Sequence, residues 1–429
     1  MKHPSMESMD EPERSVKAHA RRLAGLVEEL AERGLDAEAV LREIQAFEVQ
    51  VPSWGVGVGG TRFGRFPQPG MPNDLEDKLD DIAVLNRLCG GAASAVSLHI
   101  PWDEPRDPGA LVQGLRERGL RIGSVNSNTF QDQPGQELSY RFGSLAHVDR
   151  AVRDRAVAHN RHVLEVGEKL GARSLTVWVA DGSNYPGQIH SRRAFERYVE
   201  SCRRIHEVLP PAWSMALEHK PFEPATHHSV NMDWGTSHLA ATRVGERCRC
   251  LVDFGHHPTL YPIDVVVAML VADGRLAGFH FNDRRWADDD CTAGSVAPYQ
   301  LFLVFCELTM AARDPSVKGF GPEHMIDQSE AIKDPLEALI QTVDALQLAC
   351  AQSLLVDYDA LFEAQETNDV MRAERTLQDA FRTDVRSLVA EARRRRGGAL
   401  DPVEAFRRSG YREGMARKRP QQRGKAGAI

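Results

Sequence analysis

The stretch CLVDFGHHPTLYPIDVVVAMLVADGRLAGFHFND, residues 250–283, holds one complete strand–helix–strand unit. Its two ends, residues 250–254 and 276–281, are short apolar runs with the composition of buried β-strands. Residues 262–272 lie between them and have the length and apolar content of a helix that packs on a sheet. A strand, a helix and a second strand in this order indicate parallel strands.

The same alternation continues on both sides of this unit. Six further β-prone runs, most of them separated by helical stretches, cover residues 49–59, 93–100, 120–126, 174–179, 213–217 and 317–326. Eight strands that alternate with helices predict an α/β fold, a closed (β/α)8 TIM barrel. A doubly wound open sheet is the alternative, but GVGVGG at residues 55–60 lacks the glycine spacing of a dinucleotide-binding turn.

Helical segments flank the predicted barrel at both ends. Two helices are expected within residues 15–48, and helical patterning resumes from residue 334 and runs through the segment DPVEAFRRSGY at 401–411. No linker rich in proline or serine divides residues 50–350. We therefore expect an N-terminal helical extension (1–48), a catalytic barrel (49–355), and a C-terminal helical extension with a basic tail (356–429).

Charge and composition restrict the class of protein. The net charge is −8, but residues 393–429 hold twelve Lys and Arg against three Asp and Glu, which leaves −17 on the remainder. Such an acidic body argues against an extended nucleic-acid interface, and we expect the basic tail to be a solvated terminus. The sequence shows no membrane-spanning apolar run of about 18 residues and no secretory signal pattern. Its seven scattered cysteines suit reduced core thiols, so we expect a cytoplasmic protein.

Polar residues follow four consecutive predicted strands, where a (β/α)8 enzyme places its active site. The segments are MALEHKP (215–221), LVDFGHHP (251–258), GFHFNDRRWADDD (278–290) and GPEHMIDQS (321–329). They supply Glu218, Lys220, Asp253, His256, His257, His280, Asn282, Asp288, Asp290, Glu323 and Asp327. One acid at such a position usually caps a helix, but packing does not require the pattern on four strands in succession.

These residue types suit a divalent cation, because carboxylates and neutral imidazoles form a mixed oxygen and nitrogen site. One predicted four-ligand site consists of Glu218, Asp253, His280 and Asp327. A second predicted site consists of His256, Asp288 and Asp290, with Glu218 or Asp253 as a shared ligand. Two such metals would polarise a carbonyl and the adjacent hydroxyl of an open-chain sugar.

Aromatic residues at other strand ends suit a carbohydrate pocket. SLHIPWD (97–103) supplies His99 and Trp102, and VWVADGSNYPGQ (177–188) supplies Trp178. Aromatic rings would cover the apolar face of a sugar, and His99 would serve proton transfer to the ring oxygen. The glycine-rich loop 59–70 carries Phe63 and Phe66, which we expect to cover the pocket or to contact a neighbouring subunit.

Taken together, several motifs resemble those of the broad-specificity branch of the bacterial L-rhamnose isomerases. They are LEHKPFEP, LVDFGHHP, FHFNDRRWADDD, VWVADGSNYPGQ and DPVEAFRRSGY, together with Asp327, and the resemblance covers residues 54–411. It implies a xylose-isomerase-like barrel, two divalent ions per subunit and a homotetramer. Manganese is the expected ion, with cobalt, zinc or magnesium as alternatives.

The resemblance also implies roles for individual residues. The structural metal site is matched by Glu218, Asp253, His280 and Asp327, and the catalytic metal site by His256, Asp288 and Asp290. Lys220 matches a substrate-contacting lysine, and His99 matches a residue that helps to open the sugar ring. Phe63 or Phe66 matches an aromatic residue that reaches into a neighbouring subunit's pocket.

The predicted reaction is an aldose–ketose isomerisation by a metal-mediated hydride shift. Most strand-end acids are assigned as ligands, so a free base is lacking, whereas Lys220 suits a developing negative oxygen. His99, or a water held by Asp327, would assist ring opening. The alternative is proton transfer with Glu323 or a released Glu218 as base. Other candidate functions are a ketose 3-epimerase, an abasic-site endonuclease with zinc, and a non-catalytic sugar-binding protein.

Overall fold

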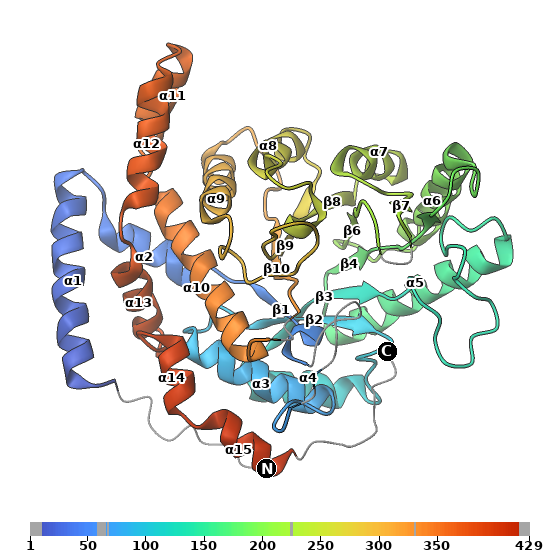
Figure 1. Ribbon diagram of the computed structural model, residues 1–429, viewed down its shortest axis with the longest axis horizontal. Helices are drawn as coiled ribbons and strands as arrows, with labels where there is room; N and C mark the ends of the chain where they lie inside the picture. Colours follow the sequence, from blue (N-terminus) through green and yellow to red (C-terminus); the bar gives the residue numbers. More distant parts are fainter. Residues whose placement is uncertain (1–10, 58–65, 67, 224–225, 330–331, 420–429) are drawn as a thin grey trace.

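Eight parallel strands close into a barrel in the order β1–β2–β3–β4–β6–β8–β9–β10 and back to β1 (Figure 1). This computed structural model describes residues 11–57, 66, 68–223, 226–329 and 332–419. The barrel strands are β1 (Gln50–Pro52), β2 (Ala95–Ile100), β3 (Arg121–Ser127), β4 (Ser174–Val177), β6 (Ser214–Glu218), β8 (Cys248–Asp253), β9 (Leu276–Phe281) and β10 (Glu323–Ile326). The predicted TIM barrel is confirmed.

Helices form the outer layer around the strands. They are α3 (Leu75–Leu88), α4 (Pro108–Glu117), α5 (Arg150–Leu170), α6 (Ser191–His206), α7 (Trp234–Val244), α8 (Ile263–Ala272), α9 (Pro298–Arg313) and α10 (Pro335–Leu354). Five of them begin at an aspartate whose carboxylate accepts a backbone N–H of the first turn: Asp74, Asp107, Asp149, Asp233 and Asp334. Such caps satisfy N–H groups that have no partner within the helix, and so fix where each helix starts.

Two barrel strands, β1 and β10, are much shorter than predicted. β1 ends at Pro52 and continues as the 3₁₀ helix η1 (Ser53–Val56), and β10 begins only at Glu323. Glu323 therefore lies at the N-terminal end of its strand, whereas Asp327 follows the C-terminal end. The prediction that Glu323 belongs to the catalytic end of the barrel is wrong for this reason, and so is the alternative in which Glu323 would serve as the base.

A small antiparallel sheet joins two loops at the C-terminal end of the barrel and was not predicted. It pairs β5 (Gly182–Ser183) with β7 (His228–Ser229), and so ties the loop after β4 to the loop after β6. Gly182 allows this close approach, because a Cβ at that position would lie 2.0 Å from the backbone oxygen of His228. Strands of two residues have no periodicity from which a sequence could predict them.

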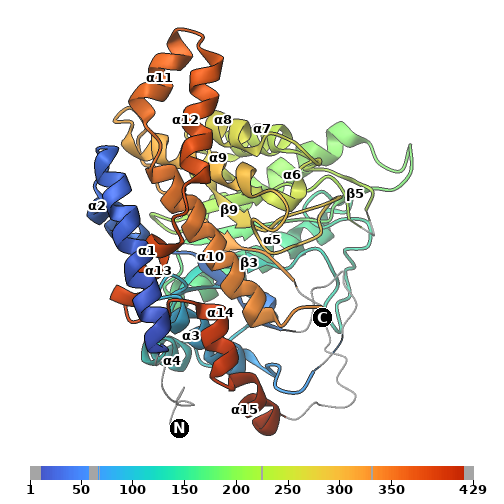
Figure 2. The same cartoon turned by 60° about the vertical axis from the view of Figure 1, so that its left-hand side comes forward.

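Helices from the two ends of the chain pack together on one side of the barrel (Figures 1 and 2). They are α1 (Glu13–Glu32), α2 (Ala37–Ala46), α11 (Tyr358–Glu366), α12 (Val370–Arg382), α13 (Arg386–Arg395), α14 (Pro402–Arg408) and α15 (Tyr411–Lys418). Buried side chains of α1, α2, α9, α10 and α13 form a second apolar core beside the main one. The helical extensions are confirmed, while their predicted boundaries at residues 48 and 356 stay predictions.

No single helix in the described part of the chain is long and apolar enough to cross a membrane. The consecutive helices α10 and α11 pass that test only as a pair, and the chain bends by 66° between them. Most apolar residues of α10 are buried against the rest of the protein.

The arginines of the C-terminal segment form ion pairs with the body of the protein. Arg412 Nε lies 2.6 Å from Asp334 Oδ2, and Arg419 NH1 lies 2.6 Å from Asp81 Oδ1. Arg393 pairs with Asp344 on α10. The expectation of a solvated tail is therefore wrong for residues 393–419, because acidic side chains of α3 and α10 face these arginines.

Candidate metal centre

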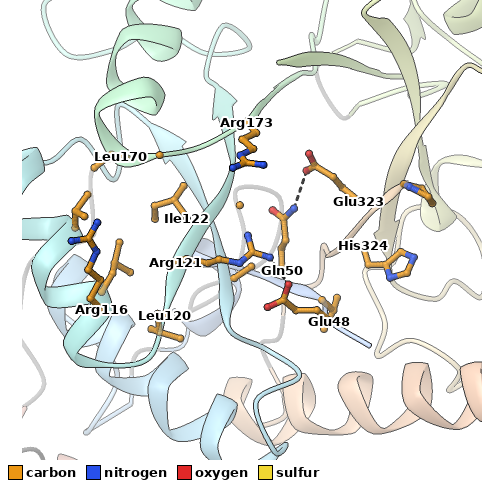
Figure 3. A pocket seen from close by; sticks show the side chains of 17 residues that line it. Glu48, Gln50, Arg116, Leu120, Arg121, Ile122, Leu170, Arg173, Glu323 and His324 are labelled. Atoms are coloured by element: carbon orange, nitrogen blue, oxygen red, sulfur yellow. Dashed lines mark hydrogen bonds and ion pairs between the residues drawn. The ribbon is translucent and has the colours of Figure 1, made fainter. Parts of the chain in front are cut away.

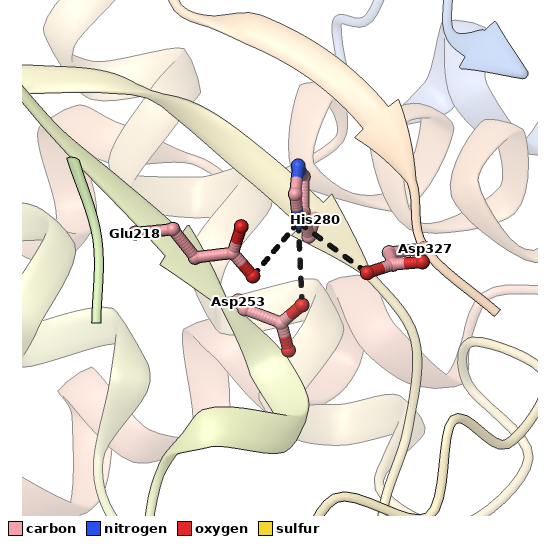
Figure 4. Close-up of side chains that lie close together, drawn as sticks. All are labelled: Glu218, Asp253, His280 and Asp327. Carbon is pink, nitrogen blue, oxygen red and sulfur yellow. Dashed lines mark hydrogen bonds and ion pairs between the residues drawn. The ribbon is translucent and has the colours of Figure 1, made fainter. Parts of the chain in front are cut away.

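Four side chains from adjacent strands meet at the C-terminal end of the barrel (Figure 4). Glu218 and Asp253 end β6 and β8, His280 lies in β9, and Asp327 directly follows β10. His280 Nδ1 lies 3.2 Å from Glu218 Oε1, 3.4 Å from Asp253 Oδ2 and 3.6 Å from Asp327 Oδ2. One ligand atom of each residue lies within 4.8 Å of the others, so the four could hold one metal ion.

The electrostatics of this first cluster favour a cation. The side chains of Glu218 and Asp253 are 7% and 1% exposed, and that of Asp327 is 22% exposed. Burial raises the pKa of Asp327 to about 6. Burial opposes ionisation of Asp253 too, but His256 and His280 outweigh it and lower the pKa of Asp253 to about 2. Buried carboxylates this close together repel one another, and a divalent cation would compensate their charge.

A second cluster shares Asp253 with the first. His256 Nε2 lies 4.0 Å from Asp253 Oδ1 and 3.4 Å from Asp288 Oδ1, and these three residues could hold another metal ion. His256 Nδ1 lies 2.8 Å from the backbone oxygen of His219. Since a carbonyl only accepts, Nδ1 carries the proton and the lone pair of Nε2 faces the two carboxylates, which is the orientation of a metal-binding histidine.

A glycine makes room for the second cluster. A Cβ on Gly255 would lie 2.8 Å from Asp288 Oδ1 and 3.2 Å from Asp253 Oδ1. Asn282 orients the shared carboxylate, because its Nδ2 donates to Asp253 Oδ1 and to the backbone oxygen of Asp327, at 3.0 Å each. The donor set and the space around it therefore fit two hard or borderline divalent cations.

Asp290 is placed differently from Asp288. It is buried and has a φ of 47°, in the left-handed region. Among the described residues it does not belong to either group of converging ligand atoms. This geometry gives no support to its predicted role as a metal ligand, which metal analysis of Asp290→Asn would test.

Lys220 connects the second cluster to the aromatic side of the site. Its Nζ lies 2.5 Å from Asp288 Oδ2, pairs with Glu223, and lies 5.1 Å from the centre of the Trp178 ring. The side chains of Lys220 and Glu223 are both buried. Sequence reasoning missed Glu223, although its place three residues after Lys220 in LEHKPFEP was the available signal.

An aromatic group surrounds His99. Its ring centre lies 4.3 Å from that of Trp102, 5.4 Å from that of Trp54 and 5.5 Å from that of Phe130, which in turn lies 4.4 Å from Trp178. The structure thus brings His99 and Trp178 together, as expected for one pocket. Sequence reasoning missed Trp54 and Phe130, which directly follow the first and third barrel strands.

The aromatic group touches the first cluster. Trp54 Nε1 donates to Asp327 Oδ1 at 2.8 Å. Burial lowers the pKa of His99 to about 3, so its imidazole is neutral near pH 7. His99 Nδ1 has no hydrogen-bond partner within the described ranges. A neutral imidazole and an acidic oxygen therefore lie on the same side of the site, beside apolar rings.

The two predicted loop aromatics remain untested. Phe66 is 59% exposed. Phe63 falls outside the described residues. Whether either side chain reaches a pocket therefore stays a prediction.

Comparisons with known proteins agree on one family. Residues 93–345 match the family model described as "Xylose isomerase-like TIM barrel". A probable sugar isomerase of Rhizobium meliloti is 49% identical over 412 residues, which cover 96% of this chain and 95% of that protein. Another from Mesorhizobium japonicum is 47% identical over 409 residues, with 95% and 94% covered. A solved L-ribulose 3-epimerase aligns with a TM-score of 0.51 and 11% identity over 72% of this chain and 95% of its own, a likeness of fold alone.

Proposed function

The chain belongs to the xylose isomerase-like TIM-barrel family, and we propose that it is a metal-dependent aldose–ketose isomerase that interconverts L-rhamnose and L-rhamnulose. The supporting observation is the pair of clusters that share Asp253 at the C-terminal end of the barrel. Relatives named as probable sugar isomerases support the reaction class. The choice of L-rhamnose rests on the sequence motifs alone, and we expect activity on other aldose–ketose pairs.

The proposal assigns two divalent ions to each subunit, with manganese as the expected metal. One would be held by Glu218, Asp253, His280 and Asp327, and the other by Asp253, His256 and Asp288. When bound, such ions supply Lewis acidity at the carbonyl and the adjacent hydroxyl of an open-chain sugar.

Lys220 would stabilise negative charge on the substrate. Its ammonium is buried and held between Glu223 and Asp288, so it cannot follow the substrate and instead fixes a positive charge at one place. A preorganised charge of this kind stabilises an oxygen that becomes negative during the reaction. Trp178, whose ring lies beside the ammonium, would cover the apolar face of the sugar.

His99 and Asp327 would assist the proton transfer that opens the sugar ring. The neutral imidazole of His99 can accept a hydrogen bond from a sugar hydroxyl. Asp327, one of the proposed metal ligands, would hold a water that takes and returns the proton. The indole of Trp54 fixes its carboxylate.

We propose that hydrogen moves between C2 and C1 as a hydride. The hydrogen and its bonding pair pass from C2 to C1, the O2 proton leaves, and O1 gains a proton. A proton route would need a free carboxylate base. Glu323 lies at the other end of its strand, and Glu218 faces His256 and His280 at 3.3 and 3.2 Å, as a ligand would.

The test is turnover of L-rhamnose by the manganese-loaded protein in deuterated water. We expect L-rhamnulose with C1 largely free of deuterium, no turnover by Asp253→Asn, and normal turnover by Asp273→Asn, which changes an exposed aspartate on the outer layer. Substantial deuterium at C1 after one turnover would contradict the hydride route.

The same assay separates the alternatives when it is run on a panel of aldoses and ketoses. A product changed only at C3 would indicate a ketose 3-epimerase. Binding without any turnover would indicate a sugar-binding protein. For the assembly we propose a homotetramer, which light scattering on the eluted protein would test.

A further inference from the structure

A cavity of about 630 Å³ lies at the end of the barrel opposite the metal clusters (Figure 3). Its barrel residues are at the N-terminal strand ends: Gln50, Arg121 and Glu323 are the first residues of β1, β3 and β10. The C-terminal ends of α4 and α5 complete the wall. This volume is within the range of small-molecule sites, and the proposed isomerase activity makes no use of it.

The floor of the cavity is a fixed polar network. Gln50 Oε1 accepts from the backbone N–H and the hydroxyl of Ser124 at 3.0 and 2.9 Å. Gln50 Nε2 and Ser174 Oγ both donate to Glu323 Oε2 at 2.8 Å. Gly123 leaves room for this arrangement, since a Cβ there would lie 2.3 Å from Gln50 Cδ.

One carboxylate oxygen of Glu323, Oε1, is available to accept a hydrogen bond. Both donors reach Oε2, and within the described ranges no residue donates to Oε1 or forms an ion pair with this carboxylate. The carboxylate is therefore held in place by neutral donors and can accept a hydrogen bond from a ligand in the cavity.

Three arginines line the cavity, and two of them have no acidic partner among the described residues. The third, Arg121, pairs with Glu48. Arg116 and Arg173 line the same cavity, and neither forms an ion pair with any residue that the structure describes. Figure 3 shows the guanidinium of Arg173 between Ile122 and Glu323. A guanidinium can bind two phosphate oxygens at once, and two guanidiniums without acidic partners make the cavity favourable for an anion.

We propose that this cavity binds a phosphate monoester of a small polyhydroxylated molecule. The phosphate would bind Arg173, a hydroxyl would donate to Glu323 Oε1, and Arg116 would add positive charge farther along the rim. An uncharged sugar would leave both guanidiniums unpaired. A dicarboxylate would bring a second negative charge toward Glu323, so the combination of dianion and hydroxyl fits this set of groups best.

The experiment is calorimetric titration of the full-length, metal-loaded protein with sorbitol 6-phosphate, sorbitol and inorganic phosphate. Sorbitol 6-phosphate has no carbonyl, so it cannot be isomerised. We expect it to bind more tightly than inorganic phosphate. In the variant that combines Arg116→Gln and Arg173→Gln we expect binding at least about tenfold weaker, since the contact with Arg173 is charge-assisted and Arg116 adds positive charge at the rim.

Three further variants test the position of the ligand. Glu323→Gln should weaken binding of sorbitol 6-phosphate but not of inorganic phosphate. Arg192→Gln, which changes an exposed arginine on α6, should bind as the unchanged protein does. Asp253→Asn, at the metal end, should also bind sorbitol 6-phosphate normally.

Each contrary result overturns the proposal. Undiminished binding by the double arginine variant, or no binding by the unchanged protein, would show that the cavity is not a binding site for the phosphate monoester. Loss of binding in Asp253→Asn alone would place the ligand at the metal end. Equal affinity for inorganic phosphate and sorbitol 6-phosphate, unaffected by Glu323→Gln, would overturn the monoester assignment in favour of free phosphate.

Discussion

Asp288 and Asp290 lie two residues apart, yet their surroundings differ at the scale of single side chains. Asp288 faces His256 and Lys220, whereas Asp290 lies outside both clusters with a left-handed backbone. We predict that Asp288→Asn loses one of the two metals and most activity, and that Asp290→Asn keeps both metals. Elemental analysis with a melting curve for each variant measures this. A variant Asp290→Asn that holds one metal would restore the ligand assignment drawn from the sequence motifs.

Single residues also show how far the sequence could predict the site. Glu218, Asp253, His280 and Asp327 were predictable, because each closely follows or ends an apolar run and parallel strands end at one side. Trp54 was not, since its partner Asp327 lies 273 positions away and the contact exists only because β1 closes the barrel against β10. Glu323 was misplaced because polar residues flank β10 on both sides, so the start and the end of the strand look alike in sequence.

At the scale of elements, the packing of α8 against α9 brings two acids together. Burial and the Asp264 carboxylate raise the pKa of Glu307 from 4.5 to about 7. A carboxyl group whose folded-state pKa is raised destabilises the folded state as pH rises from about 4.5 to about 7. Above that range Glu307 is ionised in both states, and the full cost remains.

Glu307→Gln should therefore stabilise the protein at pH 8 and have little effect at pH 4.5. The expected gain is about 1–2 kcal/mol once solvent screening of this half-buried group is included. Urea unfolding of both proteins at the two pH values measures it. An equal effect at both would show that Glu307 does not titrate differently on folding.

The start of α10, expected at residue 334, was predicted to within one residue, because the sequence marks it. An aspartate cap defines the start locally, and the apolar spacing of α5 or α10 repeats over many turns. The pair β5 and β7 had no such signal, and it exists because loops after neighbouring barrel strands meet. Local sequence signals thus predicted helices and strands, whereas a contact between two loops could be known only once the closed barrel was known.

At the scale of the whole molecule, the clustered carboxylates make stability depend on metal. Removing ions that bind only the folded state should lower its stability by about 2.7 kcal/mol when the ion had been present at 100 times its dissociation constant. Calorimetric melting before and after chelation, followed by manganese addition, measures the loss and its recovery. Asp253→Asn serves as the control and should show little further loss on chelation. An unchanged melting temperature in verified metal-free protein would contradict bound structural metal.

Residues 411–419 are fastened to helix α3 of the barrel layer at one buried acid, Asp81. Asp81 Oδ1 accepts from Arg419 NH1 at 2.6 Å and from the Tyr411 hydroxyl at 2.7 Å. We predict that Arg419→Gln lowers the free energy of unfolding by about 2 kcal/mol, because buried Asp81 loses its charge-assisted hydrogen bond and keeps only the Tyr411 hydroxyl and Arg412 NH1 at 3.5 Å. Arg408→Gln, which breaks a partly exposed pair with Glu11, should cost under about 1 kcal/mol. Equal, small losses in urea unfolding would show that Asp81 finds another partner or takes up a proton.

This fastening has a genetic consequence. In many proteins a stop codon or frameshift near the 3′ end of the coding sequence removes only a frayed terminus and is tolerated. Here, such a lesion shortly upstream of codon 411 would delete Tyr411, Arg412 and Arg419, which are the partners of Asp81, and would remove Tyr411 and Met415 from the apolar core. Late truncating alleles should therefore behave as loss-of-function alleles through failed accumulation of the protein, although every codon of the catalytic end is intact.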